Sequence, residues 1–249
     1  MHRTATFIFT IIFLCFGYEV SFGQTQTENN SQQLAIKNTI SRYYKSLGEQ
    51  SGIYRGPGYT GYPYQLSNGH QFFESPNLTQ GTIFYDGMLY QDIPMWYDLV
   101  KDQVVVQTID SLSMISLHNE RIDYFSMLGH VFKKIVQDPS NSNSLTTGFY
   151  DHIYIGKTEV LVRRYKGTLE DVSPDGIFTK ILKQKNEIYL KKEGKYFSVL
   201  SSGSVLKALG NKQKEILSHL KKNAIKFKKD PEKAIVMMVS YYDQLTIDR

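Results

Sequence analysis

Acidic side chains gather where the sequence predicts strand ends. Asp86, Asp92, Asp98 and Asp102 lie close together along the chain, and Asp151 follows an aromatic pair further on. Two carboxyl groups that face each other across a cleft are sufficient for glycoside hydrolysis. A hydrolase of glycans or peptides that uses carboxylates among Asp86, Asp92, Asp98 and Asp151 is therefore one alternative. The competing interpretation is structural, because Asp86 belongs to an Asp-Gly turn and Asp98 and Asp102 flank another turn.

Other catalytic patterns are weak or missing in the sequence. The five histidines that follow the N-terminal segment form no His-Glu-x-x-His motif and no pair at metal-ligand spacing, so we expect neither metal nor cofactor. Ser204 and Lys207 match the Ser-x-x-Lys pattern of penicillin-recognising enzymes, but no Lys-Thr-Gly follows, and Ser204 is also a predicted helix N-cap. The chain has neither a Gly-x-Ser-x-Gly elbow nor a phosphate-binding Gly-x-x-x-x-Gly-Lys loop. This favours binding over catalysis.

A glycine- and proline-rich segment at residues 54–73 holds the best candidates for recognition. Tyrosine offers a flat apolar ring with a polar tip, which suits sugars, peptides or partner proteins. Glycine lets the backbone approach a ligand closely. The predicted ligand-binding residues are Tyr54, Tyr59, Tyr62, Tyr64, Phe72 and Phe73. The alternative is that these rings plug the open end of a sheet.

Positive charge is concentrated near the C-terminus. Residues 180–229 hold fourteen lysines, no arginine and three acidic residues. A lysine-only surface suits diffuse attraction to anionic material, whereas bidentate reading of phosphate would favour arginine. The lysines expected to contact an anionic surface are Lys221, Lys222, Lys226, Lys228 and Lys229. An envelope protein, a glycan or an anionic lipid is the expected partner, nucleic acid is not, and the alternative is a merely solvated face.

The N-terminus has the pattern of a secretory signal. An apolar run at residues 5–17 follows Arg3 and is shorter than the roughly 20 residues that span a membrane. Small residues at 21 and 23 predict cleavage after Gly23, and the single cysteine, Cys15, would leave with the signal. We therefore expect an exported protein in the periplasm, at the outer membrane or outside the cell. The mature chain would keep no transmembrane segment.

The elements that position these groups fall into three blocks after the signal peptide at residues 1–23. Residues 24–80 contain one amphipathic helix, predicted from Gln32 to Leu47, and then the aromatic loop. Residues 81–200 contain about ten short β-branched or aromatic runs with short turns between them. Such connections favour antiparallel neighbours, because parallel strands need crossovers of a dozen residues or more. Residues 201–249 return to helical patterns, and we expect the three blocks to form one domain.

The strand-rich block predicts an α+β protein built on a curved antiparallel β-meander. Residues 82–85 and 88–94 flank Asp86-Gly87, a hairpin signal that needs positive φ at both positions. Residues 177–182 and 187–191 are predicted as two separate strands. A sheet of about ten strands must curl into an open barrel or split into a sandwich to cover its apolar face.

Two to three helices are expected after the sheet. A helix at residues 212–222 would carry Ile216, Leu217 and Leu220 on one side. Asp230-Pro231 is a typical helix start, because the aspartate can cap the helix and proline suits the first helical position.

Four runs cover much of the mature chain without forming a catalytic motif: NGHQFFES at 68–75, GTIFYDGMLYQDIPMWYDLVKDQVVV at 81–106, GFYDHIYIGKTEVLVRR at 148–164 and KKNAIKFKKDPEKAIVMMVSYYDQL at 221–245. Through them the chain resembles a group of exported proteins, common in Bacteroidota, to which no activity is assigned. The resemblance implies a shared fold and an envelope or secreted location. It supplies no substrate and no functional residue.

Together these features predict an exported, non-catalytic binding or cell-envelope accessory protein. The prediction depends on the missing catalytic motifs and on an aromatic loop beside a hydrophobic sheet, a combination that can form the concave apolar mouth of a ligand site. The envelope hydrolase is the first alternative. A structural partner of an outer-membrane complex is the second.

Overall fold

The computed structural model describes residues 46–63, 66, 68–141, 143–172, 175–176 and 178–247, with single positions between 32 and 43. The predicted signal peptide at residues 1–23 and the predicted contact at Tyr64 lie outside the described residues. The chain divides into a unit at 1–42 and a unit at 43–249. The described positions within 32–47 are all helical, in agreement with the predicted helix.

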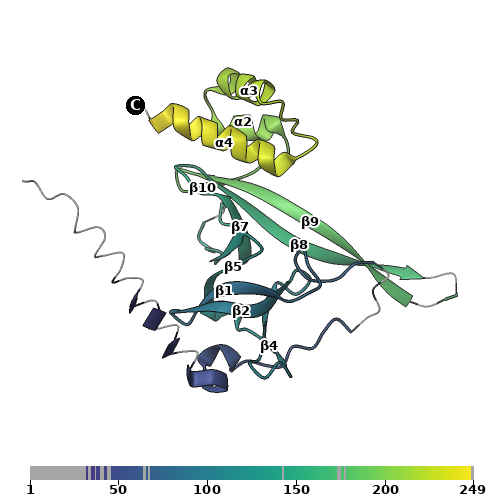
Figure 1. Ribbon diagram of the computed structural model, residues 1–249. Helices are drawn as coiled ribbons and strands as arrows, with labels where there is room; N and C mark the ends of the chain where they lie inside the picture. The colour runs from purple at the N-terminus through teal and green to yellow at the C-terminus, as the bar shows by residue number, and fades with distance from the viewer. Residues whose placement is uncertain are drawn as a thin grey trace, which may run out of the picture. The chain divides into compact units, whose positions relative to one another are not determined.

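A ten-stranded antiparallel sheet forms the centre of the second unit (Figure 1). In chain order its strands are β1 (Thr79–Tyr85), β2 (Met88–Asp98), β3 (Gln103–Gln107), β4 (Met114–Ser116), β5 (Ile122–Met127), β6 (His130–Ile135), β7 (Gly148–Tyr154), β8 (Glu159–Val172), β9 (Phe178–Lys192) and β10 (Lys195–Ser198). The order across the sheet is β10-β9-β8-β7-β6-β5-β1-β2-β3-β4. The predicted α+β fold with a curved meander is confirmed. Its one departure from chain order is that β5 pairs with β1 and not with β4.

The turn predicted at Asp86-Gly87 connects β1 to β2. Asp86 has a φ of 51° and Gly87 a φ of 73°. These are left-handed values, which a two-residue hairpin turn of this kind requires. Tyr85 pairs directly with Met88 across the turn, so this prediction is confirmed.

The last long strand corrects the sequence analysis. β8 has 14 residues and β9 has 15, and they pair without interruption from Glu159 and Lys191 to Val172 and Phe178. The two strands predicted at 177–182 and 187–191 are therefore one strand, and that prediction was wrong. The polar residues between them, at 183–186, are exposed and continue the ladder because they need no burial. Figure 1 shows the resulting ribbon of β8 and β9 extending past the other strands.

The sheet curls strongly without closing. Four strands separate β8 from β2 in the sheet order, yet the main-chain nitrogen of Lys166 in β8 donates to the oxygen of Leu99, just after β2, at 2.9 Å. The Lys166 ammonium group also donates to the main-chain oxygens of His70 and Phe72, at 2.7 and 2.8 Å. One face of the sheet is thereby turned inward. On β6 to β9, this inner face carries the register partners Phe132, Asp151, Val162 and Ile188.

Two hydrophobic clusters lie on this inner face. The aromatic cluster contains Phe73, Tyr85, Tyr90, Tyr97, Phe125, Phe132 and Phe149, with aliphatic residues of β1 to β5. The helical cluster joins β8 to β10 with the C-terminal helices and contains Val160, Val162, Leu190, Leu209, Ile216, Leu220, Ile235 and Val239. A small third cluster, around Tyr150 and Leu161, lies on the opposite face.

Three helices pack against the β8 to β10 end of the sheet: α2 (Ser202–Leu209), α3 (Gln213–Lys222) and α4 (Pro231–Ile247). The start of α4 is as predicted, because the Lys233 nitrogen donates to Asp230 Oδ1 at 3.0 Å. Leu217 of α3 is 46% exposed, so its prediction on the buried side was wrong, whereas Ile216 and Leu220 are buried.

Helix α2 is capped by Ser201, and not by Ser204 as predicted. Ser201 Oγ accepts a hydrogen bond from the Ser204 nitrogen at 3.2 Å, and Ser204 Oγ accepts one from the Ser201 nitrogen at 3.0 Å. This reciprocal arrangement is a capping box. The hydroxyl group of the Ser-x-x-Lys pattern at Ser204 therefore has a structural role.

Candidate functional site

Two of the carboxylates considered for hydrolysis have structural partners. Asp86 forms a two-point ion pair with Arg121, whose Nε donates to Oδ1 at 2.7 Å. Asp98 is fully buried, and its Oδ1 accepts hydrogen bonds from the main-chain nitrogens of Val100 and Lys101 at 2.8 and 3.0 Å. Asp98 thus satisfies donors of the turn that it flanks, as the structural interpretation predicted, whereas the Asp86 carboxylate pairs with a side chain from the segment before β5.

The remaining candidates, Asp92, Asp102 and Asp151, have different surroundings. Asp92 is exposed, has a φ of 56°, and lines a surface pocket of about 310 Å³ together with His130. Asp102 accepts a hydrogen bond from the Tyr97 hydroxyl at 2.6 Å, and burial raises the pKa of the Asp102 carboxyl. Asp151 belongs to the buried network described below. No described pocket brings two of these carboxylates together, so hydrolysis stays a prediction.

Phe72 and Phe73 of the predicted aromatic loop point to opposite faces of the sheet. The Phe73 nitrogen donates to the Tyr97 oxygen at 2.8 Å, which sets this segment beside the end of β2. Phe73 is then 1% exposed inside the aromatic cluster. Phe72 stacks on Trp96, with ring centroids 4.3 Å apart and planes inclined by 14°. Both rings therefore fill space in the fold.

The tyrosines of the loop have mixed surroundings. The Tyr59 hydroxyl donates to Asp98 Oδ2 at 2.7 Å, and Tyr54 packs against the aromatic cluster. Tyr62 is half-buried. Tyr54 and Phe73 thus pack in the aromatic cluster, in agreement with the plugging alternative, whereas Tyr59 contacts Phe72 on the other face. A role in ligand binding stays a prediction for all of these residues.

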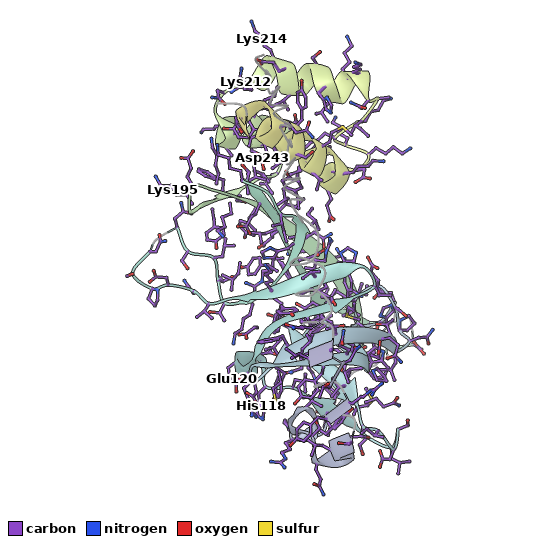
Figure 2. The ribbon with its side chains drawn as sticks, turned by 60° about the vertical axis from the view of Figure 1, so that its left-hand side comes forward. His118, Glu120, Lys195, Lys212, Lys214 and Asp243 are labelled. Carbon is purple, nitrogen blue, oxygen red and sulfur yellow. The ribbon has the colours of Figure 1, made fainter. Side chains whose placement is uncertain are left out.

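The five predicted lysines form a continuous stretch that we call the lysine surface: Lys221, Lys222, Lys226, Lys228 and Lys229. The first two end α3, and the other three lie in its connection to α4. All five are exposed, and their side chains have no hydrogen bond or ion pair within the described part of the chain. Lys212 and Lys214 extend this charge along α3, and Figure 2 shows Lys214 on the side of the helices away from the sheet.

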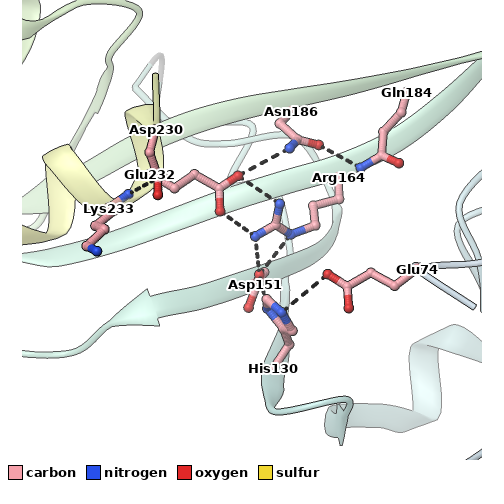
Figure 3. Close-up of polar contacts among 9 residues, drawn as sticks. All are labelled: Glu74, His130, Asp151, Arg164, Gln184, Asn186, Asp230, Glu232 and Lys233. Carbon is pink, nitrogen blue, oxygen red and sulfur yellow. Dashed lines mark hydrogen bonds and ion pairs between the residues drawn. The ribbon is translucent and has the colours of Figure 1, made fainter. Parts of the chain in front are cut away.

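A polar row with a buried centre, which the sequence analysis missed, crosses the inner face between the two clusters (Figure 3). It consists of His130 on β6, Asp151 on β7, Arg164 on β8, Asn186 on β9 and Glu232 on α4. Asp151 and Arg164 are almost completely buried. Buried charges persist in proteins when they are paired and hydrogen-bonded, and these groups meet that condition.

Arg164 is the centre of the row. Its Nε donates to Asp151 Oδ2 at 2.8 Å, and its two terminal nitrogens donate to the two carboxylate oxygens of Glu232, both at 2.8 Å. His130 Nδ1 lies 2.7 Å from the same Asp151 oxygen, and Asn186 Nδ2 donates to Glu232 Oε1 at 3.2 Å. One guanidinium group therefore connects the sheet to the first turn of α4. The fork shape of arginine suits such a bidentate pair.

The strand pattern contains a signal for this row. Val160 and Val162 of β8 face the helical cluster, and Arg164 is the next residue of the same alternation. A charge at an inward position of a strand predicts a buried partner. The identity of that partner could not be predicted, because Glu232 is on another element and far along the sequence.

Two histidines near the row have opposite electrostatic environments. The hydrogen bond to Asp151 raises the pKa of His130 above its ordinary value of 6.5. His152, on the opposite face of β7 from Asp151, is buried, and desolvation lowers its pKa to about 4. His130 also lies 3.6 Å from Glu74 through its Nε2 atom, so both of its nitrogens face carboxylates. The row thus fixes charge inside the fold and positions α4.

Comparison with known proteins gives no further assignment: no family model, no curated protein and no solved structure matches the chain. Among the described residues, no cluster of three or more histidine, cysteine, aspartate or glutamate side chains could hold a metal ion. None of the described helices is long and apolar enough to cross a membrane.

Proposed function

We propose that this protein is exported and acts without catalysis, as a binding module that attaches to an anionic lipid surface of the cell envelope through the lysine surface. The observation that carries the proposal is that Lys221, Lys222, Lys226, Lys228 and Lys229 are all exposed, and that no described acidic group neutralises them. A lysine close to an anionic membrane contributes about 1 kcal/mol of attraction. Five such side chains in one stretch are sufficient for reversible attachment.

An exposed leucine favours lipid over a glycan as the anionic partner. Leu217 of α3 is 46% exposed. It shares a helix face with Lys214 and Lys221, because residues three and four positions apart are neighbours on a helix. A face that presents lysines beside an apolar side chain is typical of helices that lie in a membrane interface.

Vesicle co-sedimentation tests the proposal. We expect the protein to bind phosphatidylglycerol vesicles at low ionic strength, to bind phosphatidylcholine vesicles weakly, and to be released by salt. Replacing the five lysines of the lysine surface by glutamine is expected to weaken binding at least tenfold.

A second five-lysine variant is the matched control, since it removes the same charge from exposed positions elsewhere: Lys133, Lys157, Lys183, Lys185 and Lys195. It should bind much more tightly than the lysine-surface variant. Equal weakening of the two variants would show that net charge alone is responsible and would overturn the proposal. Binding to an acidic polysaccharide without binding to vesicles would overturn the lipid assignment.

Export is a separate part of the proposal, supported by the N-terminal sequence pattern and by the resemblance to exported Bacteroidota proteins. Expression of the full chain in a bacterium with an envelope, followed by mass spectrometry, tests it. We expect a mature protein that begins at Gln24. A full-length chain recovered from the cytoplasm would contradict the proposal.

A further inference from the structure

A pocket of about 270 Å³ lies between β9, the residues after β10 and the start of α4. Ile188, Val199, Phe227 and Ile235 supply apolar walls, and Leu200 stands at the pocket with 83% of its surface exposed. Sites for drug-sized ligands have volumes from about 300 Å³ upward. This pocket therefore suits one slender apolar chain better than a bulky ring system.

The polar end of the pocket does not present a free charge. Glu232 is the only charged residue in its lining, and both of its carboxylate oxygens accept hydrogen bonds from Arg164. Asn186, which also lines the pocket, donates to the same carboxylate. Because this carboxylate is paired with Arg164, it presents less negative charge to the pocket than a free carboxylate would.

Positively charged residues flank one lining residue, Phe227, in the chain. Phe227 lies between Lys226 and Lys228 in the chain, and Lys229 follows. All three lysines are exposed and have no described partner, whereas Phe227 is half-buried and lines the pocket. The nearest acidic side chain in sequence, Asp230, is used as the N-cap of α4. An apolar cavity whose lining residue Phe227 is flanked in the chain by exposed lysines is complementary to a molecule with an apolar tail and an anionic head.

We infer that this pocket binds the alkyl chain of a single-chain aliphatic carboxylate, a fatty acid, while Lys226, Lys228 and Lys229 attract its carboxylate head. The inference goes beyond the proposed attachment to membranes, since it concerns a monomeric ligand in a defined cavity. It shares three lysines with the lysine surface but depends on apolar residues that membrane attachment does not need.

Calorimetric titration with decanoate, kept below its micelle-forming concentration, tests the inference on the full chain. We expect saturable binding of one decanoate per protein and weaker binding of decanol, which has the same chain without the charge. Two substitutions at the pocket, Leu200→Ser and Phe227→Ser, are each expected to weaken decanoate binding at least tenfold. Leu112→Ser removes a leucine that is equally exposed, at 83%, and lies outside the pocket, so it should leave decanoate binding unchanged.

The same variants separate this inference from the proposed function. Leu200→Ser and Phe227→Ser keep the five lysines, so they should still sediment with phosphatidylglycerol vesicles. Thermal unfolding of each variant shows whether it is folded, and the exposed position of Leu200 makes its substitution the safer one. The inference is overturned if the wild-type protein shows no saturable decanoate binding, or if Leu112→Ser weakens it as much as Leu200→Ser does. A loss of vesicle binding alone would overturn the proposed membrane attachment and leave this inference standing.

Discussion

The aromatic cluster and the helical cluster lie on one face of one sheet, but they are filled by different side chains. The aromatic cluster contains rings from β1, β2, β5, β6 and β7, such as Phe125 and Phe132, which stack with centroids 4.8 Å apart. Among the described buried residues of the helical cluster, Tyr242 is the only ring. A curled sheet leaves a wide interior that large rings fill, whereas helices approach a sheet closely and leave room for branched aliphatic side chains.

The boundary between the clusters is chemical as well as geometric. Along the inward positions of β7, Phe149 belongs to the aromatic cluster, Asp151 to the polar row, and Ile153 packs on the helical cluster. Strand β7 thus contributes to both clusters, and the carboxylate of Asp151 lies between its two contributions. The helices are therefore held to the sheet by both apolar packing and the Arg164 ion pairs.

The largest expected effect is on the aromatic cluster. Phe132→Ala should lower the free energy of unfolding by about 3–5 kcal/mol, because the ring is fully buried and its neighbours cannot fill the space. Val239→Ala, in the helical cluster, removes fewer atoms and should cost about half as much. Urea unfolding measures both values. Equal losses of unfolding free energy in the two variants would show that both clusters tolerate the removal of a buried side chain to the same degree.

Arg164→Met removes the cation of the polar row that lies between the two clusters. It leaves Asp151 buried without its cation, and we expect a loss of about 3 kcal/mol, at the low end for buried pairs because Glu232 can reach solvent. Hydrogen exchange should then become faster in α4 than in β1 and β2. Arg55→Met, at an exposed arginine, is the control and should change stability by less than about 0.5 kcal/mol. If hydrogen exchange became faster by the same factor in α4, β1 and β2, Arg164 would not be the residue that connects α4 to the sheet.

The pH dependence of stability should differ in sign for the two histidines. The raised pKa of His130 stabilises the folded state fully below pH 6.5, and this contribution is lost as pH rises through the folded-state pKa. His152, with a pKa lowered to about 4, opposes protonation of the folded state, so stability falls by about 2 kcal/mol between pH 8 and pH 5.

Urea unfolding of His130→Gln and His152→Gln across pH 4.5–9 tests this difference. The first variant should lose the decline on the alkaline side, and the second should lose the decline on the acidic side. If both variants keep the wild-type profile, the titration of other groups determines the pH dependence.

The smallest expected effect concerns the helical cluster alone. Ser201→Ala removes the N-cap of α2 and should cost about 1 kcal/mol. Ser202→Ala, one residue further on, lacks this capping role and is the matched control. A loss equal in the two variants would contradict the assignment of Ser201 as the cap.

The sequence predicted the local features of this fold well. The Asp86-Gly87 turn, the antiparallel sheet and the Asp230-Pro231 helix start each depend on residues close together in the chain, where turn and cap chemistry is decisive. The position of the predicted N-cap was wrong by three residues because both Ser201 and Ser204 belong to one capping box. The exposed lysines were also predictable, since a run such as KFKK at 226–229 cannot be buried.

The non-local features could not be predicted from pattern alone. Nothing in the sequences of β1 and β5 indicates that they pair, and nothing in Lys166 indicates that it meets Leu99. We predicted two strands in place of the continuous β9, because the polar run at 183–186 has the composition of a loop. In the structure these residues occupy exposed positions of a long β-ribbon. The Arg164–Glu232 pair and the pocket at Phe227 likewise depend on tertiary structure, which brings β8, β9 and α4 together.

The pairing of β5 with β1 has a consequence for how fast the protein folds. β1 can pair with β2 through a two-residue turn, but it can pair with β5 only after a loop that contains β2, β3 and β4 has closed. Sequence-distant pairing of this kind slows folding, because the entropy of loop closure is lost before the new contacts form. We therefore expect refolding on the millisecond-to-second scale typical of sheets with many non-local contacts. A sheet in which β5 paired with β4, its neighbour in the chain, could bury the same residues and would be expected to fold faster.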